Sequence, residues 1–250
     1  MIEILEDLFK DLHSKGIPFC HWKGYGDLEK NLEGDGDLDL FIPLEFKDKF
    51  EMVAEQISFR KLNSYQASHQ FLEHYYGFDS KSKKFVHLHL YYKIVTGEHI
   101  SKNYILPLEK YIFEKTINNT LLPSLTAKAK QNIFLIRYFI KIGSMLGILQ
   151  YLREKNKYLK EWDVIQGNSI PEGIYNLNIT EEMSNEMKIR FESNSFFRKV
   201  LYSLYIKKVL REFRRRSFMG HILYQVMNLN MRFFNKLLIK RKKLFDPGFV

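Results

Sequence analysis

Residues 34–43 constrain the fold more than any other part of the chain. They contain the run Asp37-Leu38-Asp39-Leu40-Phe41-Ile42, which begins with strict alternation of acidic and apolar side chains. This period of two predicts a strand with one buried face, and Gly36 and Pro43 bound it. The two carboxylates then project from one face, while the leucines enter the core.

The flanking patterns predict a small mixed α/β body at residues 1–122. Apolar residues at helical spacing from Leu5 to Leu12 predict a first helix, which Gly16 and Pro18 end. Two further helices are expected, over 27–32 and 44–57. The expected strands are 17–22, 37–42, 59–62 and the two arms of a hairpin, 75–79 and 85–92.

A second part, residues 123–250, is predicted to be all-helical. A cap-like Pro123-Ser124 opens an apolar-periodic segment that reaches about Lys155. Further helices are expected over 181–192, 195–216 and 219–243. The most apolar stretch, residues 133–152, contains Arg137 and Lys141, so we expect a buried helix rather than a transmembrane one.

The charge is concentrated at the C-terminal end. The net charge is +10, and residues 196–250 alone carry +12, which leaves −2 for residues 1–195. In the helix predicted over 195–216, apolar residues separate the cations, so this helix is amphipathic. We expect either a solvated helix face or an anionic partner such as nucleic acid, a membrane surface or an acidic protein.

Cysteine content and the start of the chain bear on its compartment. Cys20 is the single cysteine, which excludes an internal disulfide, and no Cys/His group has the spacing of a structural zinc site. The acidic amphipathic start is unlike an export signal. We therefore expect a cytoplasmic protein without a transmembrane segment.

Asp37 and Asp39 are the candidate metal ligands. Two carboxylates held side by side repel each other unless a cation or a shared proton compensates their charge. Oxygen ligands of this kind suit Mg²⁺, which commonly joins carboxylates to substrate phosphates. An Asp-x-Asp at a strand edge is often only solvated, so the preceding turn decides between the two interpretations.

That turn is Trp22-Lys23-Gly24-Tyr25, and Gly24 lies 13 positions before Asp37. A glycine turn lets backbone N–H groups approach a phosphate, and Lys23 adds a positive charge. The order strand, glycine turn, short helix and Asp-x-Asp strand resembles the DNA polymerase beta-like nucleotidyltransferase superfamily.

Three motifs narrow the resemblance: Cys20-His21-Trp22-Lys23-Gly24, Gly36-Asp37-Leu38-Asp39-Leu40 and His87-Leu88-His89-Leu90. They are similar to nucleotidyltransferase-like proteins encoded among bacterial and archaeal surface-polysaccharide genes. The resemblance implies transfer of a nucleotidyl group from an NTP to an acceptor such as a carbohydrate. It also implies Mg²⁺ or Mn²⁺ on Asp37 and Asp39, with phosphates on Lys23, Gly24 and Tyr25.

The chain departs from the superfamily pattern at two positions. Tyr25 stands where a small Gly or Ser is usual, and His87 stands where the third carboxylate is expected. By the period of two, His87 and His89 share a strand face, and one of them could complete the metal site or act as a base. The alternative is that both are surface or structural histidines, and the pattern favours this alternative for His89. His21 has the same two interpretations, and a partly buried histidine with its hydrogen bonds satisfied is the more common one. Glu73, His74 and Asp79 are further candidates by proximity in sequence.

Longer proteins of the resembled family continue into a thymidylate kinase-like P-loop domain. No Gly-x-x-x-x-Gly-Lys-Ser/Thr motif occurs here. The resemblance therefore suggests a separate P-loop kinase as a partner. Two functions remain open: a metal-dependent nucleotidyltransferase, and an inactive nucleotidyltransferase-fold module that binds a kinase or a glycan-assembly enzyme. A nucleic-acid-binding protein is a third option, but it does not explain the acidic strand.

Overall fold

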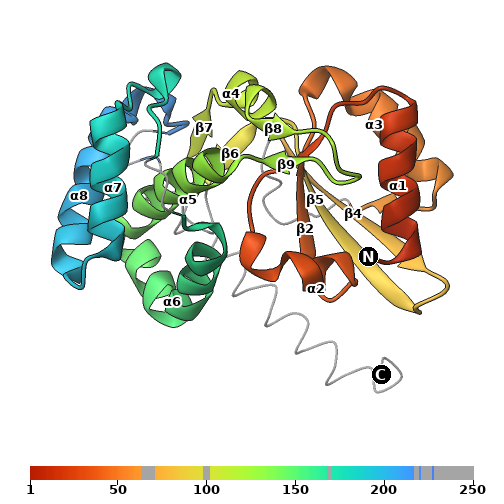
Figure 1. Cartoon of the computed structure of the whole chain (residues 1–250), viewed down its shortest axis with the longest axis horizontal. Coiled ribbons are helices and arrows are strands. Elements are labelled where there is room, and N and C mark those ends of the chain that lie inside the picture. The colour runs from red at the N-terminus through yellow and green to blue at the C-terminus, as the bar shows by residue number, and fades with distance from the viewer. Residues whose placement is uncertain (63–70, 98–101, 168–170, 217–219, 221–226, 228–250) are drawn as a thin grey trace.

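A computed structural model of the chain describes residues 1–62, 71–97, 102–167 and 171–216, together with residues 220 and 227. The described part is a mixed α/β structure with a helical C-terminal part (Figure 1). Its main sheet has seven strands in the order β3-β4-β5-β2-β1-β9-β8. These are β1 Cys20–His21, β2 Asp37–Phe41, β3 Arg60–Lys61, β4 Leu72–Asp79, β5 Lys84–Tyr91, β8 Thr116–Ile117 and β9 Ser124–Leu125.

The strand pairing makes the sheet mixed. β2 runs parallel to β5, and β1 runs parallel to β9, whereas the other pairs are antiparallel. A separate two-stranded sheet is formed by β6 (Ile94–Thr96) and β7 (Tyr104–Leu106). β2 and β5 are therefore neighbours at the centre of the main sheet, in parallel register.

Eight α-helices lie within the described ranges. They are α1 Glu3–Ser14, α2 Leu28–Leu32, α3 Lys47–Gln56, α4 Glu109–Glu114, α5 Ala127–Ile142, α6 Met145–Ile165, α7 Glu181–Glu192 and α8 Phe196–Val209. Four 3₁₀ turns join them, η1 Tyr25–Asp27, η2 Leu44–Phe46, η3 Tyr175–Leu177 and η4 Arg211–Phe213. None of the helices in the described part of the chain is long and apolar enough to cross a bilayer.

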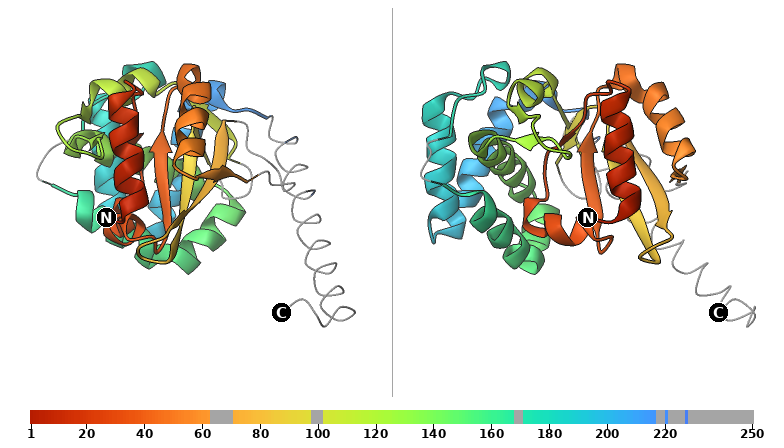
Figure 2. Two further views of the ribbon diagram at one scale, coloured as in Figure 1. Left: turned by 90° about the vertical axis from the view of Figure 1, so that its right-hand side faces the viewer. Right: turned by 45° about the vertical axis from the view of Figure 1, so that its right-hand side comes forward.

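One face of the sheet is sealed by α1 and α3. Figure 2 shows these two helices on one side of the strands and the helices after residue 127 on the other. Leu38 and Leu40 of β2 and Leu88 of β5 are fully buried on the sealed side, packed with Leu8 of α1 and Val53 of α3. The apolar half of the alternating pattern therefore forms one continuous core.

The opposite face is covered only in part. Phe41 of β2 and Tyr91 of β5 are buried in a second core together with Trp22 and the apolar residues of α5. Toward the start of β2 the same face becomes polar, and the side chain of Asp37 is 53% exposed. The site residues lie at this boundary between core and solvent.

Most expected elements occur near their expected places. The first helix, the Asp-x-Asp strand, the hairpin and the helix over 181–192 are confirmed. The strand expected over 17–22 is reduced to Cys20–His21. Apart from residues 220 and 227, the helix expected over 219–243 lies outside the described residues.

The buried helix expected over residues 133–152 is wrong as a single element, because α5 and α6 divide this apolar segment between them. Ser124 belongs to β9, and Thr126 is the residue before α5. The apolar segment then breaks at Gly143, and the side chain of Ser144 accepts from the Gly147 N–H to begin α6. A hydroxyl that satisfies a free N–H at a new helix start explains why apolar periodicity alone missed the break.

The helix expected over 195–216 also ends early. Its last α-helical residue is Val209, and a β-bridge then pairs Arg214 with Tyr104 of β7. The Arg215 N–H donates to the Asn103 carbonyl at 2.9 Å. Arg214 and Arg215 therefore lie beside β7 instead of continuing an amphipathic helix.

Candidate metal and anion site

The polar ends of β2 and β5 lie side by side. In their parallel register Asp37 is opposite His87, and Asp39 is opposite His89. Because alternate residues of a strand share a face, all four side chains project from the face that carries Phe41 and Tyr91. The Asp-x-Asp and His-x-His patterns thus form one two-by-two array.

The neighbouring strand β4 adds two more side chains to the same face of the sheet. His74 is opposite His89, and Tyr76 is opposite His87. The Tyr76 ring stacks on the His87 ring, with centroids 4.2 Å apart, and His74 Nδ1 lies 3.0 Å from His87 Nε2. Burial and the neighbouring His89 and His87 lower the pKa of His74 to about 4, so this imidazole is neutral at physiological pH.

Asp37 is the exposed member of the acidic pair. Its Oδ1 lies 2.6 Å from His87 Nδ1, and its Oδ2 lies 3.8 Å from His89 Nε2. The hydrogen bond from His87 lowers the pKa of the Asp37 carboxyl below its usual value, against a smaller opposing effect of burial. Asp37 is therefore an ionised carboxylate open to solvent on one side.

Asp39 is nearly enclosed but still ionised. Burial alone would raise the pKa of its carboxyl, but Lys23 and His89 together hold that pKa well below its usual value. Lys23 Nζ lies 2.5 Å from Asp39 Oδ1, and His89 Nδ1 lies 3.3 Å from the same oxygen. The Lys23 ammonium also lies 4.8 Å from the Tyr91 ring centroid. The cation predicted to bind phosphate is therefore paired with the inner aspartate.

The glycine turn lies against Asp39 and has a backbone conformation that favours glycine. Gly24 has φ +80°, and a Cβ on it would lie 3.4 Å from Asp39 Oδ2. The Gly24 N–H donates to Glu161 Oε1 of α6 at 2.9 Å, and the Tyr25 hydroxyl donates to the His21 carbonyl at 2.7 Å. A phosphate at Gly24 would have to displace the Glu161 carboxylate.

Four cations interact electrostatically with the charged groups beside this turn. Lys102 follows the two-stranded sheet's first arm, Arg137 and Lys141 belong to α5, and Lys23 precedes the turn. Arg137 Nη1 pairs with Glu161 Oε1 at 3.2 Å. Burial and the nearby Lys23 lower the pKa of Lys102 to about 7, and burial with Arg137 and Lys102 lowers that of Lys141 well below its usual value.

Charge near the turn is therefore unbalanced. Asp39 and Glu161 are the carboxylates among the charges that act on the four cations Lys23, Lys102, Arg137 and Lys141 in the described part of the chain. Burial is the largest cause of the lowered lysine pKa values, and the neighbouring positive charges add to it. A polyanion bound here would restore the charged forms of these lysines.

The structure brings together some predicted site residues and separates others. Asp37, Asp39, His87 and Lys23 meet, and Gly24 lies against Asp39, but Tyr25 is buried with its hydroxyl bonded to the backbone. Glu73 pairs with Lys47 of α3 and Lys61 of β3, and Asp79 accepts a hydrogen bond from the Ile4 N–H. Both therefore belong to the sealed face, away from the array.

His21 is fully buried in β1, and its ring meets Tyr25 edge to face, with centroids 4.7 Å apart. Neither of its ring nitrogens has a hydrogen-bond partner among the described residues. Burial lowers the pKa of His21 to about 4. It is thus a neutral core residue in this structure.

Sequence reasoning missed the contribution of three residues. Glu161 and Lys102 carry no local motif, and Arg137 was recognised only as a charge that interrupts an apolar helix. Lys102 approaches the Tyr91 ring at 5.8 Å, and Arg137 approaches the Trp22 ring at 5.7 Å. A charge inside an otherwise apolar helix was the one available signal, because such a charge needs a buried partner.

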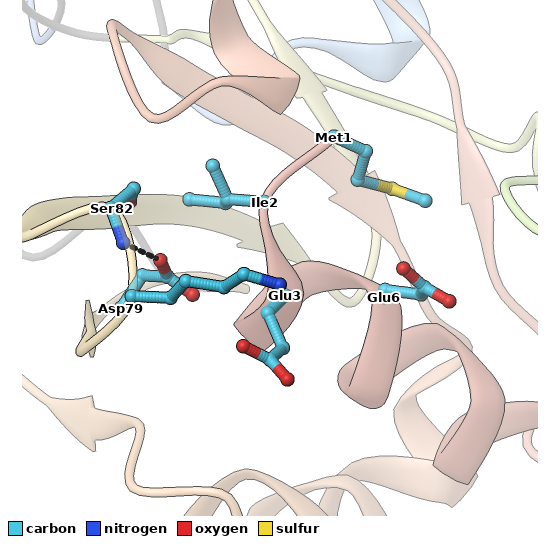
Figure 3. A pocket seen from close by; sticks show the side chains of 7 residues that line it. Met1, Ile2, Glu3, Glu6, Asp79 and Ser82 are labelled. Carbon is cyan, nitrogen blue, oxygen red and sulfur yellow. Dashed lines mark hydrogen bonds between the residues drawn. The ribbon is translucent and has the colours of Figure 1, made fainter.

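A pocket of about 320 Å³ lies elsewhere (Figure 3). It is lined by Met1, Ile2, Glu3, Glu6, Asp79, Lys81 and Ser82. Asp79 belongs to the α1 side of β4, opposite to His74 and Tyr76. This pocket is therefore separate from the acid and histidine array.

Comparison with known proteins identifies no similar protein. No family model matches the chain, and neither a curated protein nor a solved structure matches it. Function is therefore argued from the array itself.

Proposed function

We propose that this protein is a nucleotidyltransferase that uses a divalent metal ion, Mg²⁺ or Mn²⁺, and an NTP as donor. The observation that carries the proposal is the position of Asp37 and Asp39 on one strand face, beside the four cations near Gly24. Carboxylates that ligate a metal, next to excess positive charge, match the needs of a metal-bound triphosphate. The nucleotidyltransferase type of the α/β fold is part of the same proposal.

The residues present suit such an ion. Asp37 offers ionised oxygens toward solvent, and Asp39 is held in its ionised form. Bound at these carboxylates, the ion would polarise the attacked phosphorus and neutralise charge on the phosphate oxygens. Lys23, which is shared with Asp39, is the cation nearest to that position.

The other cations act on the leaving group. Lys102 and Lys141 are lysines whose positive charge is disfavoured until an anion arrives. A pyrophosphate leaving group carries the charge that would stabilise both ammonium groups. A carbohydrate acceptor in surface-polysaccharide synthesis follows from the motif resemblance alone and is proposed on that basis.

Calorimetry and a pyrophosphate-release assay test the proposal together. The full chain is titrated with ATP, CTP, GTP and UTP, with Mg²⁺ or Mn²⁺ and without either ion. Release of pyrophosphate is then followed with a panel of sugars and sugar phosphates. We expect metal-dependent binding of at least one NTP and turnover that falls by about 100-fold or more in Asp39→Asn. Turnover unchanged in Asp39→Asn would contradict the mechanism.

A second function is favoured by the closed state of the glycine turn. Gly24 already donates to Glu161, and His87 occupies the place of the third carboxylate. An inactive module could bind an NTP and partner a P-loop kinase or a glycan-assembly enzyme. It would not need a Gly24 N–H that is free to bind a phosphate for catalysis. Metal-dependent NTP binding without pyrophosphate release, across all acceptors tested, would favour the module over the enzyme.

A further inference from the structure

We propose that His74, His87 and His89 bind one divalent transition-metal ion, of which Zn²⁺ is the representative. Each of the three side chains offers one ring nitrogen, and these atoms lie within 4.8 Å of one another. Around a tetrahedral ion with Zn–N bonds of about 2.0–2.1 Å, neighbouring ligand atoms are about 3.3–3.4 Å apart. His74 Nδ1 and His87 Nε2 share a hydrogen bond at 3.0 Å, which is close to that spacing. The ion would take the place of the shared proton, which would move to Nε2 of the neutral His74 ring.

The backbone fixes this arrangement. His74 is paired with His89 across the β4–β5 hairpin, and His87 is two residues from His89 on the same face. The three rings contact one another, with centroid separations of 4.4–5.2 Å. Ligands held on two adjacent strands need only small side-chain rotations to close around an ion, so little conformational freedom is lost on binding.

The two aspartates determine which ring nitrogens are available. An ionised carboxylate only accepts hydrogen bonds, so His87 Nδ1 donates to Asp37 and leaves Nε2 unprotonated in the neutral ring. His89 Nδ1 likewise faces Asp39 at 3.3 Å, which leaves Nε2 for the ion. Histidines that bind metals commonly donate their other N–H to a carboxylate, which orients the ring and raises its basicity.

The chemistry of the donors selects the ion. Three imidazoles suit zinc, copper, iron, cobalt or nickel, whereas Mg²⁺ prefers oxygen ligands. Asp37 Oδ2 lies 3.8 Å from His89 Nε2 and is the nearest carboxylate oxygen for a fourth position. Because the Asp37 side chain is half exposed, water or a substrate oxygen can also reach that position.

This site does not depend on nucleotidyl transfer. A carboxylate has about four lone-pair positions, so Asp37 can accept from His87 and still contact a second cation. If the transferase proposal fails because no NTP turns over, the imidazole site is unaffected. If the imidazole site fails, Mg²⁺-dependent turnover at Asp37 and Asp39 is equally unaffected.

The first test uses the full chain, stripped of metal by a chelator, with no nucleotide present. Zn²⁺ is titrated by calorimetry, and Co²⁺ is used as a visible probe. We expect one equivalent of Zn²⁺ to bind and Co²⁺ to give the intense absorption of a four- or five-coordinate ion. An excess of Mg²⁺ should not displace either metal.

Variants then locate the ion. His74→Gln should weaken Zn²⁺ binding by more than about 100-fold, the upper end of the effect expected when only a supporting hydrogen bond is lost. Asp37→Asn, which keeps the three imidazoles, should weaken it by about 10–100-fold. His13→Gln is the matched control, because His13 lies on α1 and contacts the Leu121 carbonyl instead. It should bind Zn²⁺ as the unaltered chain does.

Imidazole NMR of the unaltered chain makes the test independent of whether a variant folds. Of the eight histidines in the chain, Zn²⁺ should shift the ring signals of three, His74, His87 and His89. Weak six-coordinate Co²⁺ absorption with no shifted imidazole would overturn the proposal. Equal loss of Zn²⁺ binding in His74→Gln and His13→Gln would overturn it as well.

Discussion

The two faces of the central sheet carry opposite kinds of residue on the same strands. Leu38 and Leu88 pack under α1 and α3 with no exposed surface, whereas Asp37 and His87 start the other face. That second face begins as a polar array and ends as core at Phe41 and Tyr91. Neighbouring residues of β2 or β5 therefore point to opposite faces, one into the apolar core and the next into the polar site.

The difference shows where the fold tolerates unfavourable burial. The sealed face places few polar groups in the core, while the other face buries Asp39 and a set of cations beside it. Desolvation of such charges costs free energy unless partners compensate it. Lys23 compensates Asp39, but Lys102 and Lys141 remain undercompensated. We infer that the second face is arranged for a ligand rather than for stability alone.

The largest expected effect lies on the sealed face. Leu88→Ala removes a fully buried side chain between β5 and the helices, and should lower the free energy of unfolding by about 3–4 kcal/mol. Urea denaturation measures the change. Phe85→Ala on the other face is the control. Phe85 is 69% exposed and meets the Phe78 ring at a tilt, so its loss should cost less than about 1.5 kcal/mol. Equal losses would show that the two faces are not packed differently.

The pH dependence of the free energy of unfolding tests whether His21 is buried as a neutral ring without hydrogen-bond partners. The pKa of His21 is lowered from 6.5 to about 4 in the folded chain, so the unfolded chain binds the extra proton between these values. The free energy of unfolding therefore contains the full contribution of a neutral, buried His21 above pH 6.5. It decreases as the pH drops toward 4, by about 3 kcal/mol from this residue. Urea denaturation of His21→Phe should show a correspondingly flatter profile. An unchanged profile would mean that His21 is not buried in its neutral form.

Anion binding should depend on Lys102. With a pKa of about 7, this lysine is charged below pH 7 and must take up a proton to meet an anion above it. Calorimetry should show affinity for Mg²⁺-ATP decreasing by up to about tenfold per pH unit above 7. Lys102→Gln should bind ATP more weakly and lose much of this pH dependence. A Lys102→Gln profile that parallels the unaltered one would assign the pH dependence to another group.

The smallest effect is expected at Asp37. Its side chain is 53% exposed, so solvent screens its pairing with His87, and Asp37→Asn should change the free energy of unfolding by less than about 1 kcal/mol. The same change should markedly weaken metal binding. A loss above 2 kcal/mol in urea denaturation would make Asp37 a structural residue and weaken the contrast between the faces.

Local periodicity predicted the elements that carry the array. The period of two in β2 and β5 gives the faces of Asp37, Asp39, His87 and His89 without any knowledge of tertiary contacts. The hairpin expected from the arms 75–79 and 85–92 is present, and its first strand begins earlier, at Leu72, so that His74 pairs with His89. Local periodicity could not predict the parallel register of β2 and β5, because this register joins residues 50 positions apart and is set by packing.

The electrostatic surroundings could not be predicted in this way. Glu161 reaches the Gly24 N–H across 137 residues, and its role depends on how α6 docks against η1. A Cβ on Gly26 would lie 3.0 Å from Glu161 Cα, so that docking needs a glycine there. The helix break at Gly143 was hidden for a related reason, since apolar residues continue on both sides of it.

Anomalous diffraction at the zinc edge, from crystals of the full chain grown with Zn²⁺, tests most directly whether the polar face of the sheet is a metal site. We predict one strong peak about 2.0–2.1 Å from ring nitrogens of His74, His87 and His89, with Asp37 beside it. A fully occupied zinc ion elsewhere on the molecule, with these three imidazoles still contacting one another, Asp37 and Asp39 and no ion, would contradict this account.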